Sequence, residues 1–160
     1  MVVAEDDPEM QRLMMEELIS DGHRVIGATN GIELIDLLRG FHDTSTEPTV
    51  LVTDLWMPGL NGLDIIRMIR AWGWCVPVIL LSAFPDHETL SKANAAGVTT
   101  FLAKPFGLED LRAMVGKLGG RGLCQGREVS TPREPETGSQ DIAPSASQSS
   151  LVVDRQRGSA

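Results

Sequence analysis

The sequence contains no long apolar segment. Within its 160 residues, no run approaches the roughly 18 consecutive apolar residues that a membrane-spanning helix requires. The N-terminus also lacks a basic segment followed by an apolar one, which is the pattern of a secretory signal peptide. We therefore expect a cytoplasmic protein that has no membrane among its partners.

Cysteine is also scarce. The chain has two, Cys75 and Cys124, and their spacing matches no metal-binding or redox motif. This argues against a zinc site or a disulfide framework. It agrees with a reduced, cytoplasmic setting.

A basic surface is missing as well. The formal net charge is -8, and all of it belongs to residues 1–118, because the remainder of the chain carries acids and bases in equal number. A domain that binds DNA directly is expected to carry a basic patch. The charge balance therefore argues against direct DNA binding by this chain.

Aromatic residues and hydrophobic periodicity are absent from the last part of the chain. Every Phe and Trp lies at or before Phe106, and residues 119–160 are rich in Gly, Ser and Pro. Such a segment cannot bury enough apolar surface to offset the entropy lost on ordering. We predict a folded domain over residues 1–118 and a disordered tail over 119–160, in which Leu151–Val153 is either a short docking motif or unstructured.

Short apolar segments rich in β-branched residues recur through the first 118 residues. Their composition is typical of strands that are buried on both faces, as in a parallel sheet. The five predicted strands cover residues 1–4, 23–28, 49–54, 77–82 and 98–102.

Helical patterns separate these strands. In the first, Asp7 is placed to cap the helix, Pro8 suits its first turn, and Gly22 ends it. The others begin near Gly31, Leu63, Asp86 and Gly107. Five such β–α units predict a doubly wound, flavodoxin-like α/β/α domain, with a five-stranded parallel sheet in the order 2-1-3-4-5.

Polar side chains follow the predicted strands at the points where they end. Glu5 and Asp6 come after the first strand, Asp54 ends the third, Ser82 ends the fourth, and Lys104 follows the fifth. Ligands of such sheets bind outside the carboxyl ends of the strands, where the strand order reverses. Close carboxylates need a cation, and hard oxygen ligands suit Mg²⁺. The sequence therefore predicts a magnesium site at this edge.

This set of groups suits phosphoryl transfer to Asp54. A magnesium ion and Lys104 would neutralise the phosphoryl oxygens, and the Ser82 hydroxyl would donate a hydrogen bond. The Gly and Pro residues after Asp54 allow a tight loop, so that a backbone carbonyl, that of Trp56, can also reach the metal.

Four motifs carry a resemblance to a known family: EDDP (5–8), D-x-x-MPG-x-NG (54–62), LLSA (80–83) and AAGVTTFLAKPF (95–106). In this order and spacing they resemble the receiver domain of the response regulators of two-component signalling, of the stand-alone chemotaxis type. The resemblance implies that Asp54 accepts a phosphoryl group from a histidine kinase or a phosphotransfer protein. Glu5 and Asp6 resemble the acidic Mg²⁺ pair.

The resemblance also implies roles around the acceptor. Ser82 resembles the switch hydroxyl, Phe101 the switch aromatic and Lys104 the family's lysine, and the Lys104–Pro105 bond resembles a cis peptide. Phosphorylation would then rearrange the surface of the fourth helix, the fifth strand and the fifth helix. That surface would signal to a downstream protein or form a homodimer. Such a protein is a signalling phosphoacceptor rather than an enzyme.

By the family's geometry, three residues tune access to the phosphorylated aspartate. Trp56 and Phe84 would flank the path of the attacking water, and neither offers a carboxylate or amide to orient it. Ala83 is small and would leave the phosphodonor's path open. This implies an ordinary rate of phosphorylation and slow autodephosphorylation.

Other functions are less consistent with these residues. A phosphorylation-independent adaptor usually lacks an acid or the lysine, whereas this chain retains them. A phosphohydrolase of the haloacid dehalogenase type carries a second aspartate where this chain has Trp56. A flavodoxin-like cofactor binder would need a phosphate-binding first loop, which Glu5, Asp6 and Asp7 would oppose by repulsion. Because no output domain is evident after Leu118, we expect either a stand-alone receiver or a fragment of a longer protein.

Overall fold

The computed structural model describes residues 1–83 and 86–119, in which strands and helices alternate. In chain order, the elements are β1 Val2–Ala4, α1 Pro8–Ser20, β2 Ile26–Ala28, α2 Gly31–Asp43, β3 Leu51–Asp54, α3 Gly62–Ala71, β4 Val78–Ser82, α4 His87–Ala96, β5 Thr100–Ala103 and α5 Leu108–Gly119. None of the helices in this described part is long and apolar enough to cross a membrane.

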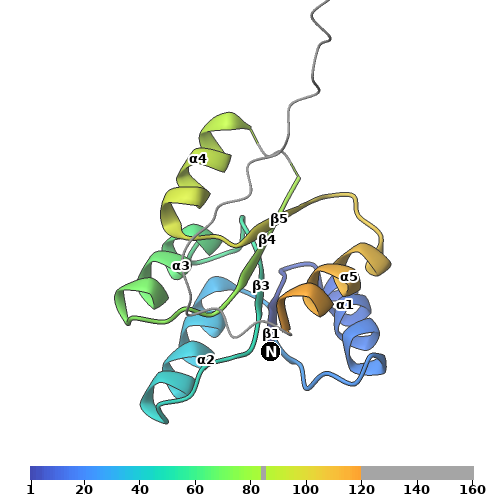
Figure 1. Cartoon of the computed structure of the whole chain (residues 1–160), viewed down its shortest axis with the longest axis horizontal. Coiled ribbons are helices and arrows are strands. Elements are labelled where there is room, and N and C mark those ends of the chain that lie inside the picture. Colours follow the sequence, from blue (N-terminus) through green and yellow to red (C-terminus); the bar gives the residue numbers. More distant parts are fainter. Residues whose placement is uncertain (84–85, 120–160) are drawn as a thin grey trace, which may run out of the picture. The chain divides into compact units, whose positions relative to one another are not determined.

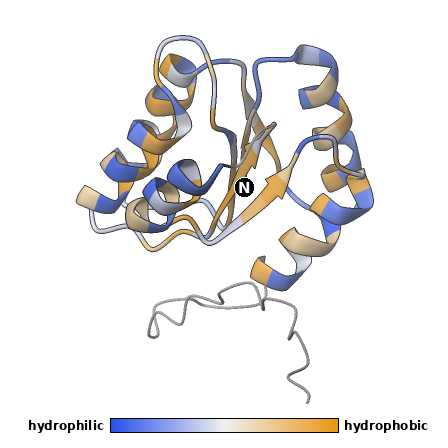
Figure 2. Cartoon of the chain, turned by 90° about the horizontal axis from the view of Figure 1, so that it is seen from above, coloured by the Kyte–Doolittle hydropathy of each residue, from blue (hydrophilic) through white to orange (hydrophobic). Residues whose placement is uncertain are grey.

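The five strands form one parallel sheet in the order β2-β1-β3-β4-β5. Helices α1 and α5 cover one face of this sheet, and α2, α3 and α4 cover the other (Figure 1). The view along the edge shows the hydrophobic strands as a middle layer between the two layers of helices (Figure 2). The predicted doubly wound, flavodoxin-like architecture and its strand order are confirmed.

The sheet carries a separate hydrophobic core on each face. Successive strand residues point to opposite faces, so that Val52 packs with α1 and α5 whereas Leu51 packs with α2, α3 and α4. All four residues of β3 and all five of β4 are buried, which is why the central strands appear as continuous apolar runs in the sequence.

The helix starts follow local sequence signals. Asp7 caps α1 by accepting hydrogen bonds from the amides of Glu9 and Met10, and Pro8 is the first helical residue, as predicted. Asn30, Asn61 and Asp86 cap α2, α3 and α4 in the same way. These caps satisfy amide groups that have no partner within the helix.

All five strands begin one to three residues later than predicted, and hydrogen bonds show the reason at β2 and β5. The ladder of β2 begins at Ile26 rather than at residue 23, because the His23 amide donates to the Leu18 carbonyl and completes the end of α1. Strand β5 begins at Thr100 rather than at residue 98, because the Val98 amide donates to the Ala93 carbonyl at the end of α4. In both places, the first residue of the predicted strand instead bonds to the end of the preceding helix.

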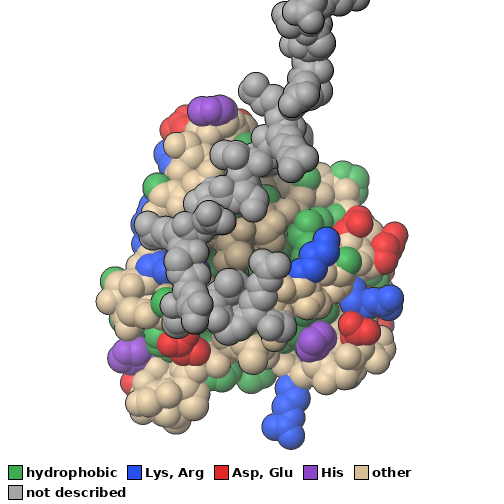
Figure 3. All heavy atoms as spheres, viewed as in Figure 1, with side chains coloured by type: hydrophobic (Ala, Val, Ile, Leu, Met, Phe, Trp, Pro, Cys, Tyr) green, Lys and Arg blue, Asp and Glu red, His purple; other side chains and the backbone are tan. Residues whose placement is uncertain are grey.

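Ionic contacts join the two helices on the α1/α5 face. The guanidinium of Arg112 on α5 lies 3.1 Å from a carboxylate oxygen of Glu17 and 4.0 Å from one of Asp21. Figure 3 shows side chains of both signs gathered over these helices. Because all three side chains are at least a quarter exposed, these pairs contribute little stability compared with the buried core.

Candidate functional site

The candidate site lies at the carboxyl ends of the central strands. Strand β1 pairs with β2 on one side and with β3 on the other, so the strand order reverses at β1 and β3. In this fold class, ligands bind outside the carboxyl ends of the strands at such a reversal. Glu5 and Asp6 follow β1 directly, and Asp54 is the last residue of β3.

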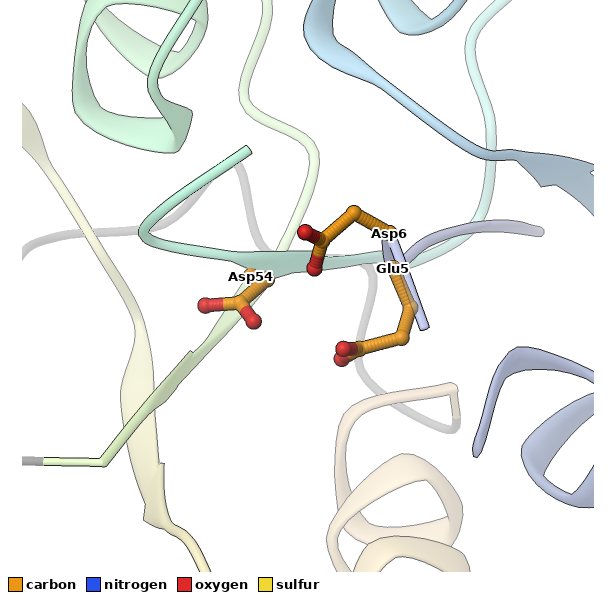
Figure 4. A group of neighbouring side chains, drawn as sticks. All are labelled: Glu5, Asp6 and Asp54. Atoms are coloured by element: carbon orange, nitrogen blue, oxygen red, sulfur yellow. The ribbon is translucent and has the colours of Figure 1, made fainter. Parts of the chain in front are cut away.

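Three carboxylates meet at this position. One oxygen from each of Glu5, Asp6 and Asp54 lies within 4.8 Å of the others, and Figure 4 shows the three side chains grouped above the end of β3. Glu5 is 1% exposed and Asp54 is 7% exposed, whereas Asp6 is open to solvent. The group can hold a metal ion with carboxylate oxygens, and the exposed side at Asp6 leaves room for water ligands.

Lys104 contacts two of these carboxylates, although it is 99 residues from Glu5 and 50 residues from Asp54 along the chain. Its Nζ lies 2.8 Å from both oxygens of Glu5 and also donates a hydrogen bond to Oδ2 of Asp54. It is placed there by its position directly after β5, where its backbone amide donates to the Ser82 carbonyl at 2.9 Å. The lysine therefore places a positive charge at the Asp54 carboxylate.

The shared lysine does not fully compensate the buried acids. Burial raises the pKa of Glu5, and the charge of Asp54 acts in the same direction, against the lowering effect of the hydrogen bonds from Lys104. Burial by itself would lower the pKa of Lys104, but hydrogen bonds to Asp54 and Glu5 outweigh it and the pKa is raised. Two nearly buried carboxylates thus share one ammonium group, and an additional cation would relieve their repulsion.

The loop after Asp54 is held close to the Asp54 carboxylate. The Trp56 amide donates to Oδ1 of Asp54 at 3.1 Å, and the Gly62 amide donates to the Leu55 carbonyl at 3.0 Å. A Cβ atom at Gly62 would overlap the Asp54 carbonyl oxygen. Glycine at this position therefore allows α3 to start directly against the end of β3.

Ser82 and Phe101 lie on the neighbouring strands. Ser82 is one residue beyond Leu81, the register partner of Asp54, and its hydroxyl oxygen is buried without a hydrogen-bond partner among the described residues. A buried hydroxyl without a hydrogen-bond partner is unusual in proteins, so that of Ser82 is expected to bond to a ligand or a water molecule. Phe101 pairs with Leu80 and packs, half-buried, on the side of α2, α3 and α4.

The model of the response regulator receiver domain family matches residues 1–116. This chain belongs to that family. As a receiver domain it is a module of two-component signalling. Receiver domains act as phosphoacceptors for histidine kinases or phosphotransfer proteins, and they are not generally classed as enzymes.

The curated relatives of this receiver domain are longer proteins. The KDP operon transcriptional regulatory protein KdpE of Escherichia coli is 34% identical over 113 residues, which is 70% of this chain and 47% of the relative. The response regulator MprA of Mycobacterium avium is 32% identical over 112 residues, with the same two coverages of 70% and 47%. The chain thus spans about half the length of the curated relatives it matches.

Solved receiver domains have the same fold as this one. The receiver domain of the Francisella response regulator 1452 matches with a TM-score of 0.66 and 27% identity, covering 74% of this chain and 93% of that one. The receiver domain of the sensor kinase PA1611 from Pseudomonas aeruginosa matches with a TM-score of 0.64 and 29% identity, covering 75% and 96%. That structure holds a magnesium ion in its active-site cleft.

Two of the three residues predicted to tune access to Asp54 lie at the surface of this receiver domain. Trp56 is 70% exposed beside Asp54, Ala83 is exposed, and Phe84 lies outside the described residues. The Lys104–Pro105 peptide bond is cis, as the resemblance implies.

Sequence reasoning missed one residue that contacts the acidic turn. The side-chain amide of Gln11 on α1 donates hydrogen bonds to backbone carbonyls of this region. A glutamine within an amphipathic helix resembles any solvent-facing residue, so no signal in the sequence distinguishes it. The direct contact of Lys104 with Glu5 was also not anticipated, because it depends on how β5 lies relative to β1.

Proposed function

We propose that this receiver domain accepts a phosphoryl group on Asp54 from a histidine kinase or phosphotransfer protein in a magnesium-dependent reaction. The observation that supports it most is the grouping of Glu5, Asp6 and Asp54 within 4.8 Å, with the Lys104 ammonium bonded to the Asp54 carboxylate. The acceptor, its cation ligands and a fixed positive charge thus converge from three strand ends.

The residues present fit a magnesium ion. Glu5, Asp6 and Asp54 would hold it through carboxylate oxygens, and the Trp56 carbonyl would supply a further oxygen ligand. When bound, Mg²⁺ neutralises the phosphoryl oxygens during transfer. This would also offset the repulsion between the buried acids, since Lys104 alone serves both Glu5 and Asp54.

The protein's own groups supply the remaining chemistry. A carboxylate oxygen of Asp54 attacks the phosphorus atom, and the phosphorus–nitrogen bond of the donor phosphohistidine breaks. Lys104 donates to an oxygen of the transferred group. The Ser82 hydroxyl, which has no partner among the described residues, is available to donate to another.

Contacts of Lys104 and Ser82 would transmit the effect of phosphorylation from the site to the surface of the domain. The Lys104 amide bonds to the Ser82 carbonyl, and Phe101 lies on β5 two register steps before Ser82's partner, Ala103. In α4, only Ala93 and Ala96 are buried, so this helix is weakly held by packing. We infer that α4, β5 and α5 form the output surface, which would bind a downstream protein or a second copy of the chain.

The boundary of the receiver domain is also part of this proposal. We place the signalling domain at residues 1–118. Of the tail predicted over residues 119–160, Gly119 is instead the last residue of α5, and residues 120–160 lie outside the described part of the structure.

The proposal can be tested with a small phosphodonor. The protein is incubated with acetyl phosphate and Mg²⁺, and the intact mass is measured over time. We expect one added phosphoryl group, and none when EDTA removes the metal. Full labelling in EDTA would show that the acidic cluster does not act through a cation.

The lifetime of the phosphorylated protein is expected to depend on Trp56. Its side chain is 70% exposed and its backbone amide bonds to the Asp54 carboxylate, and we infer that the indole obstructs an in-line water without orienting it. Changing Trp56→Asn together with Phe84→Glu should shorten the lifetime by about tenfold, which corresponds to only about 1.4 kcal/mol of barrier. Decay of the phosphorylated protein is followed by intact mass after the donor is removed.

An exposed apolar residue distant from the site serves as the control for this lifetime. Ile19 on α1 is 52% exposed, and Ile19→Asn should leave the decay unchanged. If the double variant decays no faster than this control, the side chains do not shield the acceptor.

A further inference from the structure

The side chain of Gln11 bridges the acidic turn and the edge strand of the sheet. Its Nε2 donates to the Ala28 carbonyl at 2.5 Å and lies 3.4 Å from the Glu5 carbonyl. Both neighbours are carbonyl oxygens, so the amide must present its NH₂ group to them, and each of its two hydrogens can serve one acceptor. Gln11 is half-buried at this position.

These bonds complete a small network around the backbone of Glu5. The Glu5 amide donates to the same Ala28 carbonyl at 3.1 Å, and the pairing of β1 with β2 ends at Ala4 opposite Ala28. Glu5 is therefore held to the sheet through its amide. The Gln11 side chain reaches the carbonyl of the same residue.

The close approach of α1 to β2 makes this reach possible. A Cβ atom at Gly27 would lie 2.7 Å from the Met15 sulfur and 3.4 Å from the Gln11 amide carbon. The absence of a side chain at Gly27 thus leaves the space into which Met15 and Gln11 fit. Because α1 is capped at Asp7, Gln11 lies one turn into the helix, and its side chain leans back toward the helix start.

We propose that Gln11 is a positioning residue for the cation site. It fixes the turn at Glu5 and Asp6, so that both carboxylates are directed at Asp54, and it acts through the backbone without touching the ion. This inference rests on the proposed magnesium-dependent function. Hydrogen bonds behind metal ligands typically change metal affinity by about 10- to 100-fold when they are removed. Since Gln11 bonds to backbone rather than to a ligand atom, we expect the lower value.

The test replaces the amide while keeping the length of the side chain. Gln11→Met removes both donors, and Arg12→Met is the matched control on the next residue. Arg12 is 61% exposed and contacts Glu16 only on the helix surface. Both variants and the wild type are titrated with Mg²⁺ while the backbone amide of Trp56 is followed by NMR, and hydrogen exchange of the Glu5 amide is measured without metal.

We expect Gln11→Met to bind Mg²⁺ about tenfold more weakly than the wild type and to exchange the Glu5 amide faster, with Arg12→Met unchanged in both. A lower melting temperature of Gln11→Met with unchanged Mg²⁺ affinity and Glu5 exchange would overturn the inference, because the glutamine would then be structural only. A wild type that binds no Mg²⁺ would instead overturn the proposed function. In that case, if the Glu5 amide exchanged faster in Gln11→Met than in the wild type and Arg12→Met, the result would still support the role of Gln11 in fixing the turn.

Discussion

Replacing Asp54 by asparagine is expected to abolish phosphoryl incorporation. The asparagine side chain has nearly the same shape, and its oxygen can still accept the hydrogen bond that the Trp56 amide donates to Asp54 at 3.1 Å. Asparagine has an NH₂ group in place of the second carboxylate oxygen and carries no negative charge, so it offers no nucleophile to attack phosphorus. The loss should therefore be complete, although the domain remains folded, and intact mass after incubation with acetyl phosphate and Mg²⁺ measures it.

An aspartate away from the site serves as the control. Asp36 on α2 pairs with Arg39 at 3.3 Å, and its side chain is 65% exposed. Asp36→Asn should incorporate one phosphoryl group as the wild type does. Continued labelling of Asp54→Asn would mean that another residue accepts the group and would refute the assignment of Asp54.

Replacing Gly31 by alanine is expected to have the largest effect on stability. Gly31 begins α2, and its amide donates to the Pro58 carbonyl at 3.0 Å in the loop that follows Asp54. A Cβ atom here would overlap the backbone carbonyl and amide of Leu60, which cannot move aside as a flexible side chain could. We expect a loss of about 3 kcal/mol in the free energy of unfolding, or a fall in Tm of roughly 10 °C.

Gly40 on the same helix provides a matched control. A Cβ atom at this position meets nothing within 4 Å. Gly40→Ala should raise the free energy of unfolding by about 0.5–1 kcal/mol, because alanine favours the helix. Both variants are compared with the wild type by thermal melts and urea unfolding. Equal stability of the two variants would show that the loop after Asp54 can retreat from α2.

The architecture could be predicted because its signals are local. Continuous apolar runs indicate strands buried on both faces, and the cap at Asp7 with Pro8 begins a helix whatever lies around it. The alternation of strands and helices, together with the right-handed crossover of β–α–β units, then leaves few sheet orders. The strand ends that carry Glu5, Asp54, Ser82 and Lys104 follow from that order.

The strand bounds could not be predicted in the same way. His23 and Val98 begin two of the predicted strands, but their amides are used at the ends of α1 and α4. Which partner a backbone amide takes depends on where the preceding helix stops. That is decided by how the helix packs on the sheet, and only the tertiary structure shows it.

The fold class, the family resemblance and the types of residue at the strand ends could be read from the sequence. The contacts between these residues depend on the tertiary structure. Lys104 reaches Glu5 because β5, β4, β3 and β1 hold a common register, and Gln11 reaches Ala28 because Gly27 admits α1 closely. Each contact joins segments that are distant along the chain, so its geometry depends on the packing of several elements at once.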